Sequence, residues 1–227
     1  MKFLPLALTA LLLPVTAHAA GSAITLTPSW SGSLVVPDND GVGVSSSITV
    51  VAPGLDRIES VTMQLEIDGG WNGDLYGYLV HDGKLAMLMN RPGRAAANPG
   101  GYGSSGMNVM FSDLAVGDIH LTLPDSGVPT GFFQPDGRLT DPLAVLDTDA
   151  RTALLAVFTN ENPNGTWTLF LADQGPGDTS TLKSWSLAVT VVPEPSAALM
   201  MGVAVMLGAV GRRRRRFGMR RVMGRDA

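Results

Sequence analysis

The sequence contains no cysteine, so it has neither a disulfide framework nor thiol chemistry. Histidine is scarce, with only three residues in the chain. Basic side chains are rare between Gly21 and Val192, where seven stand against eighteen acidic ones and give a net charge of −11. A body of this charge repels nucleic acid, which excludes DNA and RNA as a class of partner.

The first 20 residues have the pattern of a secretory signal peptide. Lys2 forms a short basic region, residues 4–15 are apolar, and Ala17 and Ala19 flank His18 in a small-x-small cleavage site. The alternative is an N-terminal core helix, but two prolines and the cleavage pattern disfavour it. We therefore expect export by the general secretory route.

The C-terminal segment, residues 193–227, pairs an apolar stretch with a basic cluster. Residues 196–211 carry no charge and predict a membrane helix, slightly short of the usual ~20 residues. Five consecutive arginines follow and predict a cytoplasmic end by the positive-inside rule: Arg212, Arg213, Arg214, Arg215 and Arg216. The alternative is a buried helix followed by a basic tail.

The body, residues 21–192, has the length of one domain and is patterned for strands. Apolar and polar side chains alternate strictly in residues 60–68, which is typical of a half-buried strand. The same period predicts strands at 24–27, 46–52, 75–81, 84–90, 108–111, 119–123, 153–159, 165–173 and 183–192.

Turn signals separate these strands. Asp82-Gly83 predicts a tight hairpin, residues 91–106 predict a long flexible loop, and residues 147–152 are the one plausible helix start. Many short strands without alternating helices predict an all-β fold, an antiparallel jelly-roll β-sandwich.

Four motifs occur in the order found in the P domain (P/Homo B domain) of proprotein convertases and bacterial subtilisin-like proteases. They are Val36-Pro37-Asp38, the segment 71–75 (WNGDL), Phe111-Ser112-Asp113, and the segment 163–187 with its two tryptophans. Residues 30–192 thus resemble this family. The resemblance implies a jelly-roll sandwich that accompanies a subtilisin-like protease and supports its folding, although only about ten residues separate the signal peptide from the start of the resemblance at residue 30.

The C-terminal segment resembles a PEP-CTERM sorting signal. Its three parts are Val192-Pro193-Glu194-Pro195, the apolar stretch and the arginine cluster. This resemblance implies recognition by an exosortase at the inner membrane of a Gram-negative bacterium, then cleavage and release or attachment at the cell envelope. Eleven residues follow the arginines, more than such tails usually carry.

The sequence offers little for catalysis. A Ser-His-Asp site needs a histidine beside a serine, and only His81 and His120 remain after export. We expect both to be surface or strand residues, and no nucleophile elbow is present. No carboxylate is forced by the pattern into an apolar pocket, so the sequence predicts no enzyme of its own.

Four aspartates in the family-like motifs could bind calcium, which takes six to eight oxygen ligands. They are Asp74, Asp113, Asp173 and Asp178. Aspartates at strand ends also accept hydrogen bonds from turn amides without any metal. Both readings stay open, and Ca²⁺ is the one cofactor that the sequence suggests.

The tryptophans also allow two interpretations. Trp167 and Trp185 lie in register with aliphatic residues, so we expect them in the core, whereas Trp71 lies in a turn. Exposed together, they would form a platform for sugar rings.

These observations favour an exported, non-catalytic binding, matrix or accessory module with extracellular polysaccharide as a partner. The first alternative is a partner of a subtilisin-like serine endopeptidase encoded elsewhere. The second is a self-contained hydrolase.

Overall fold

A computed structural model describes residues 23–55 and 57–192. The signal peptide with Ala17 and Ala19, the sorting motif after Val192, the apolar stretch and the arginine cluster all lie outside the described residues. Within the described part of the chain, no helix is long and apolar enough to cross a membrane.

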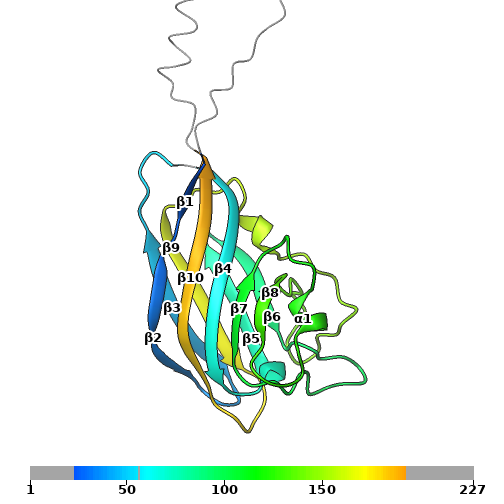
Figure 1. The fold of residues 1–227 in the computed structure, drawn as a ribbon. Coiled ribbons are helices and arrows are strands. Elements are labelled where there is room, and N and C mark those ends of the chain that lie inside the picture. The colour runs from blue at the N-terminus through cyan, green and yellow to red at the C-terminus, as the bar shows by residue number, and fades with distance from the viewer. Residues whose placement is uncertain (1–22, 56, 193–227) are drawn as a thin grey trace, which may run out of the picture. The chain divides into compact units, whose positions relative to one another are not determined.

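The described residues fold into two β-sheets (Figure 1). The strands are β1 (Ile24–Leu26), β2 (Ser29–Val36), β3 (Asp40–Val50), β4 (Arg57–Gly69), β5 (Leu75–His81), β6 (Lys84–Asn90), β7 (Met107–Phe111), β8 (Thr130–Phe133), β9 (Gly165–Asp173) and β10 (Ser180–Val192). Three short helices are η1 (Asn72–Asp74), α1 (Ile119–Thr122) and η2 (Leu155–Phe158).

One sheet has the order β1-β10-β4-β7-β8, with β2 also paired to β10, and the other has the order β3-β9-β5-β6. Every pair is antiparallel except β7 with β8, which is parallel. The predicted all-β sandwich is confirmed, and the parallel pair departs from the antiparallel arrangement expected throughout.

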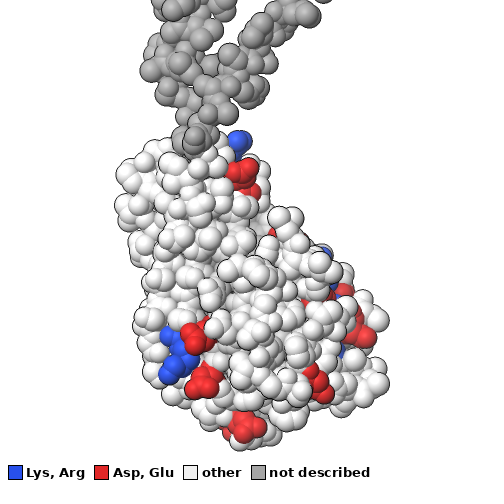
Figure 2. Space-filling model, viewed as in Figure 1, with Lys and Arg blue, Asp and Glu red and all other residues white. Residues whose placement is uncertain are grey.

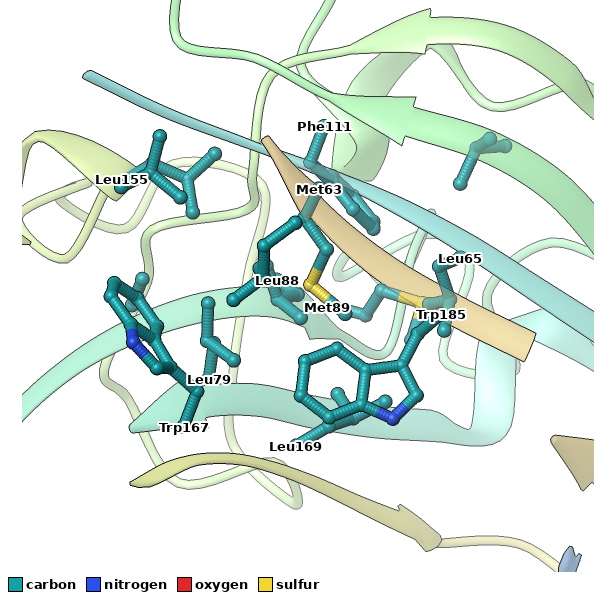
Figure 3. Packing of buried hydrophobic residues seen from close by; sticks show 14 of the residues in the cluster. Met63, Leu65, Leu79, Leu88, Met89, Phe111, Leu155, Trp167, Leu169 and Trp185 are labelled. Atoms are coloured by element: carbon teal, nitrogen blue, oxygen red, sulfur yellow. The ribbon is translucent and has the colours of Figure 1, made fainter. Parts of the chain in front are cut away.

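Alternation of side chains builds the interior. Along β5 and β10, buried residues alternate with half-exposed ones, because successive side chains of a strand point to opposite faces. Trp167 of β9 and Trp185 of β10 are fully buried in one apolar cluster with Met63 (Figure 3). The indole N–H of Trp185 donates to the hydroxyl of Ser46 on β3, 2.9 Å away, which satisfies a buried polar group between the sheets.

The strand β6 is buried along most of its length because an irregular segment covers it. The backbone N–H groups of Asp136 and Gly137 donate to the carbonyls of Leu88 and Met87, and Met87 N–H donates to the carbonyl of Ala153. Residues 134–153, which we call the β6 cover, therefore close the edge of this sheet.

Three local predictions are wrong. Residues 119–123 form a helical turn rather than a strand, because Asp118 accepts a hydrogen bond from His120 N–H and caps the turn. Residues 153–159 contain the 3₁₀ helix η2, and residues 147–152 form turns instead of a helix start. The strands β2 and β8 were not expected from the sequence.

Candidate functional site

Strand register gathers acidic residues at one end of the sandwich. Asp173, the last residue of β9, pairs with Leu75 on one side and with Asp40 on the other. Asp74 therefore lies one residue from this pairing, and the backbone N–H of Gln174 donates to its carbonyl at 2.8 Å. We call Asp38, Asp74 and Asp173 the acidic loop cluster.

Each carboxylate of this cluster has a partner within the fold. Nη2 of Arg91 lies 2.8 Å from Oδ1 of Asp74, and Nε of Arg91 donates to the carbonyl of Gly73. Oδ1 of Asp173 accepts the N–H of Gly175 at 3.0 Å. Asp38 accepts the N–H of Gly177 at 3.0 Å. The bonds from the backbone amides of Gly175 and Gly177 are turn-capping contacts. Turn capping is the alternative to metal binding that the sequence left open.

Electrostatics in the cluster disfavour full ionisation. Burial raises the pKa of the Asp74 carboxyl, Arg91 opposes this effect, and Asp38 and Asp178 add to it. Burial also raises the pKa of Asp173; the Gly175 amide opposes it, and the charges of Asp74 and Asp38 reinforce it. Like charges close together disfavour the charged form of each group, so added positive charge would stabilise this end.

The four aspartates predicted as calcium ligands do not share one place. Asp74 and Asp173 lie together, and Asp178 is an exposed residue that acts on Asp74 through its charge. Asp113 follows the end of β7 that is remote from Gly69, and it accepts the N–H groups of Leu155 and Ala156 at the start of η2. The described residues contain no group of three or more His, Cys, Asp or Glu side chains arranged to hold a metal ion. Calcium binding stays a prediction, and Asp38 joins the aspartates to be tested.

His81 and His120 are both buried; His81 is a strand residue, as expected, whereas His120 is neither a surface nor a strand residue. His81 ends β5 and stacks on Trp167 with ring centroids 4.0 Å apart. Its nitrogens face the carbonyls of Thr166 and Asn162. His120 lies in α1 rather than in a strand, and Nδ1 is 2.7 Å from Oδ2 of Asp136. In the described part of the chain, neither imidazole is hydrogen-bonded to a serine.

His120 belongs to a buried ionic network, formed by Asp118, His120, Asp136, Arg138 and Arg151. Nη1 of Arg138 lies 2.9 Å from Oδ2 of Asp118 and 3.2 Å from Oδ1 of Asp136. Nε of Arg151 lies 3.4 Å from Oδ2 of Asp118. Buried charges persist when they are paired in this way. Asp136 is completely inaccessible, although no pattern in the sequence marks it for burial.

The hydrogen bonds of the buried ionic network link separate segments of the fold. Nε2 of His120 donates to the carbonyl of Arg94 at 2.8 Å, so both ring nitrogens are engaged within the fold. Arg151 also donates to the carbonyls of Asp136 and Pro135. The network thereby fastens α1 to the β6 cover.

Two further features lie at the surface of the protein. Trp71 is 40% exposed, in contrast to the two core tryptophans, whose predicted burial is confirmed. Leu114, Val116 and Phe132 are all strongly exposed and line a surface pocket of about 500 Å³ together with Ser112 and Ala115. We call these three large residues the Phe132 patch.

Residues 143–189 match the family model of the proprotein convertase P-domain. They span the end of the β6 cover, η2, β9 and most of β10. The resemblance inferred from the sequence is confirmed over this part of the chain. No curated protein matches the chain in sequence.

Two solved structures are similar in fold. The complex of the Aeromonas sobria serine protease with a chaperone has 16% identity, covers 76% of this chain and has a TM-score of 0.44. The serine protease of Aeromonas sobria has 14% identity, covers 78% of this chain and has a TM-score of 0.43. The chain spans 28% of the length of each of these proteins.

Proposed function

We propose, from the P-domain match at residues 143–189, that this protein is an exported, non-catalytic module with a binding, matrix or accessory role at the cell envelope. The observation that carries the non-catalytic part of the proposal is that the ring nitrogens of His81 and His120 are all hydrogen-bonded within the fold. Each directs both ring nitrogens at backbone or carboxylate oxygens of the fold, so neither is free to act as a general base. We also propose that the chain has a jelly-roll topology and that the protein is sorted to the cell envelope.

The envelope location rests on the two ends of the sequence. β10 ends at Val192, the first residue of the sorting motif, so the motif follows the last strand without a spacer. This order supports the proposed pathway. The pathway consists of export through the signal peptide, membrane anchoring through residues 196–211 and processing by an exosortase. Mass spectrometry of the mature C-terminus tests the pathway: a terminus near Pro195 supports it, and an intact Ala227 contradicts exosortase cleavage.

The non-catalytic character is tested with a fluorophosphonate probe and a panel of peptide and glycoside substrates. We expect no covalent labelling and no turnover. Labelling at a serine, or turnover that a single Asp→Ala change abolishes, would establish the self-contained hydrolase instead. Heat-denatured protein and an active subtilisin serve as the negative and positive controls.

A second candidate function, support of a separately encoded subtilisin-like protease, is favoured by the Phe132 patch. Soluble proteins rarely leave several large apolar side chains exposed together unless a partner covers them. Leu114 is 94% exposed and Phe132 is 66% exposed. Co-purification of a subtilisin-like protease that is lost in Phe132→Ser, and retained in Val42→Ser on β3, would establish this role. Val42 is a matched control because it is an exposed apolar residue outside the patch.

A further inference from the structure

Trp71 occupies a bend that the fold fixes in place. Gly69 and Gly70 at the end of β4 have φ angles of 71° and 75°, a region that favours glycine. A side chain at Gly70 would collide with the hydroxyl of Ser180. The chain therefore turns sharply, and Trp71 enters η1 in an extended conformation with its ring at the surface.

The indole ring is also fixed. Its Nε1–H donates to the carbonyl of Gly100 at 3.0 Å, which sets the plane of the ring. The six-membered part of the ring lies against Gly103, where an added Cβ would approach Cη2 to 2.7 Å. The ring thus lies against backbone, and Trp71 as a whole residue is still 40% exposed. A rigid aromatic surface loses little conformational entropy on binding.

A hydrogen-bonding group stands beside the ring. Oδ1 of Asp125 accepts the N–H of Gly103 at 2.6 Å, the same glycine against which Trp71 packs. The Asp125 side chain is exposed, and its second carboxylate oxygen has no hydrogen bond within the described residues. A carboxylate oxygen accepts hydrogen bonds from ligand hydroxyls.

An open aromatic ring beside a free carboxylate oxygen fits a pyranose, which presents an apolar C–H face and hydroxyl groups at its rim. The net charge of −11 between Gly21 and Val192 and the Asp125 carboxylate both repel anionic sugars. Figure 2 shows one face of the molecule, on which charged side chains cover a small part of the surface. Charge therefore selects neutral glycans over acidic ones.

We propose that Trp71 and Asp125 form a subsite for a neutral polysaccharide, with the indole stacking on a sugar ring and Asp125 accepting a hydroxyl hydrogen. This inference rests on the proposed binding role and names its ligand class. Trp71 supplies the stacking surface, Gly100 and Gly103 hold it in orientation, and Asp125 orients the sugar.

The test is affinity electrophoresis of the full-length protein in gels that contain dextran, mannan, xyloglucan or, as the acidic comparison, alginate. We expect the wild-type protein to be retarded by at least one neutral glycan and not by alginate. Trp71→Ala is expected to weaken binding about tenfold, the scale of one lost aromatic contact, with Trp71→Phe in between. Asp125→Asn keeps an acceptor oxygen and is expected to weaken binding less than Asp125→Ala.

Val42→Ala is the matched control, because it truncates an exposed apolar side chain outside both Trp71 and the Phe132 patch and is expected to leave glycan retardation unchanged. A folding defect is separated from a binding defect by tryptophan fluorescence. In the wild-type protein, glycan is expected to protect Trp71 from acrylamide quenching, a protection that is absent in the correctly folded Trp71→Phe variant.

The outcomes separate this inference from the proposed function. If a glycan retards the wild-type protein and Trp71→Ala equally, the protein binds glycan at another site. This outcome would overturn the Trp71 subsite and leave the proposed binding role intact. Retardation by alginate alone would overturn the choice of neutral glycans. If no glycan retards the protein and Trp71→Ala instead loses a co-purifying protease, the ring belongs to a protein interface and the subsite is overturned.

Discussion

Oδ2 of Asp136 lies 2.7 Å from Nδ1 of His120, and both side chains are fully buried. The other ring nitrogen of His120 faces the carbonyl of Arg94, which can only accept a hydrogen bond. Nε2 therefore carries hydrogen, and the contact of Nδ1 with a carboxylate favours the cationic form of His120. Burial alone would lower its pKa, but the hydrogen bond and charge of Asp136 and the Arg94 carbonyl outweigh burial and raise the pKa above 6.5.

Stability is therefore expected to fall at mildly alkaline pH. A raised histidine pKa contributes stability that is fully present below the unfolded value of about 6.5 and is lost as pH rises through the folded value. Chemical denaturation between pH 5.5 and 9 would measure this slope. The same series in His120→Gln is expected to show a flatter profile and a loss of about 3–5 kcal/mol at low pH, because the buried Asp136 then keeps Arg138 as its cationic partner and loses His120. Identical slopes in both proteins would contradict this role of His120.

Asp74 and Asp173 should respond differently to the same substitution. Asp173→Asn keeps an oxygen for the Gly175 N–H and removes one charge from the acidic loop cluster, so we expect it to be neutral or stabilising at pH 7. Asp74→Asn leaves Arg91, which is mostly buried, without its anion and is expected to cost about 1–3 kcal/mol. Urea unfolding of both variants measures the contrast. Equal losses would show that repulsion among these carboxylates is unimportant.

The pH dependence expected of Asp173 has the opposite direction to that of a salt-bridged carboxylate. Because burial raises the pKa of Asp173 in the fold, protonation of this carboxyl is easier in the folded than in the unfolded state. The charge of Asp173 therefore lowers stability once pH rises from the unfolded value of 3.8 through the raised folded value. The free energy of unfolding of the Asp173→Asn variant is therefore expected to depend less steeply on pH in this acidic range, because the contribution of Asp173 is missing.

Three of the strands that were predicted correctly have one solvated face. In β4, β5 and β9, the alternation in sequence is the alternation of burial, so the pattern can be read without the fold. The apolar runs at 119–123 and 153–159 are too short for periodicity to separate strand from helical turn. There the outcome was decided by Asp118 and Asp113, whose carboxylates bind the first amides of α1 and η2.

The sites depended on register and on contacts between distant segments. Asp74 and Asp173 meet only because β5 pairs with β9 at Leu75, which the sequence does not specify. The burial of Asp136 depends on His120, sixteen residues earlier in the chain, and on Arg138 in the same irregular segment. No local pattern marks such a pair, whereas the burial of Trp185 follows from its aliphatic neighbours in β10.

Asp113 should act as a cap and not as a metal ligand. Its two carboxylate oxygens accept the N–H groups of Leu155 and Ala156, which begin η2. Asp113→Ala is expected to cost about 1 kcal/mol, the usual effect of losing a helix cap. Asp113→Asn keeps one acceptor and should lose less. Thermal melts in buffers with and without calcium measure both variants, and a loss that appears only with calcium would reassign Asp113 to an ion site.

Calcium is expected to leave the melting temperature of the wild-type protein unchanged, apart from the effect of ionic strength. The reason is that Asp38, Asp74 and Asp173 each already have a partner within the fold, in Gly177, Arg91 and Gly175. Differential scanning fluorimetry in 5 mM calcium chloride, in chelator, and in sodium chloride of matched ionic strength tests this expectation. A ligand that binds only the folded state raises stability according to its concentration relative to its dissociation constant. A calcium-specific rise of several degrees that is abolished in Asp173→Asn and kept in Asp113→Asn would therefore establish an ion site in the acidic loop cluster.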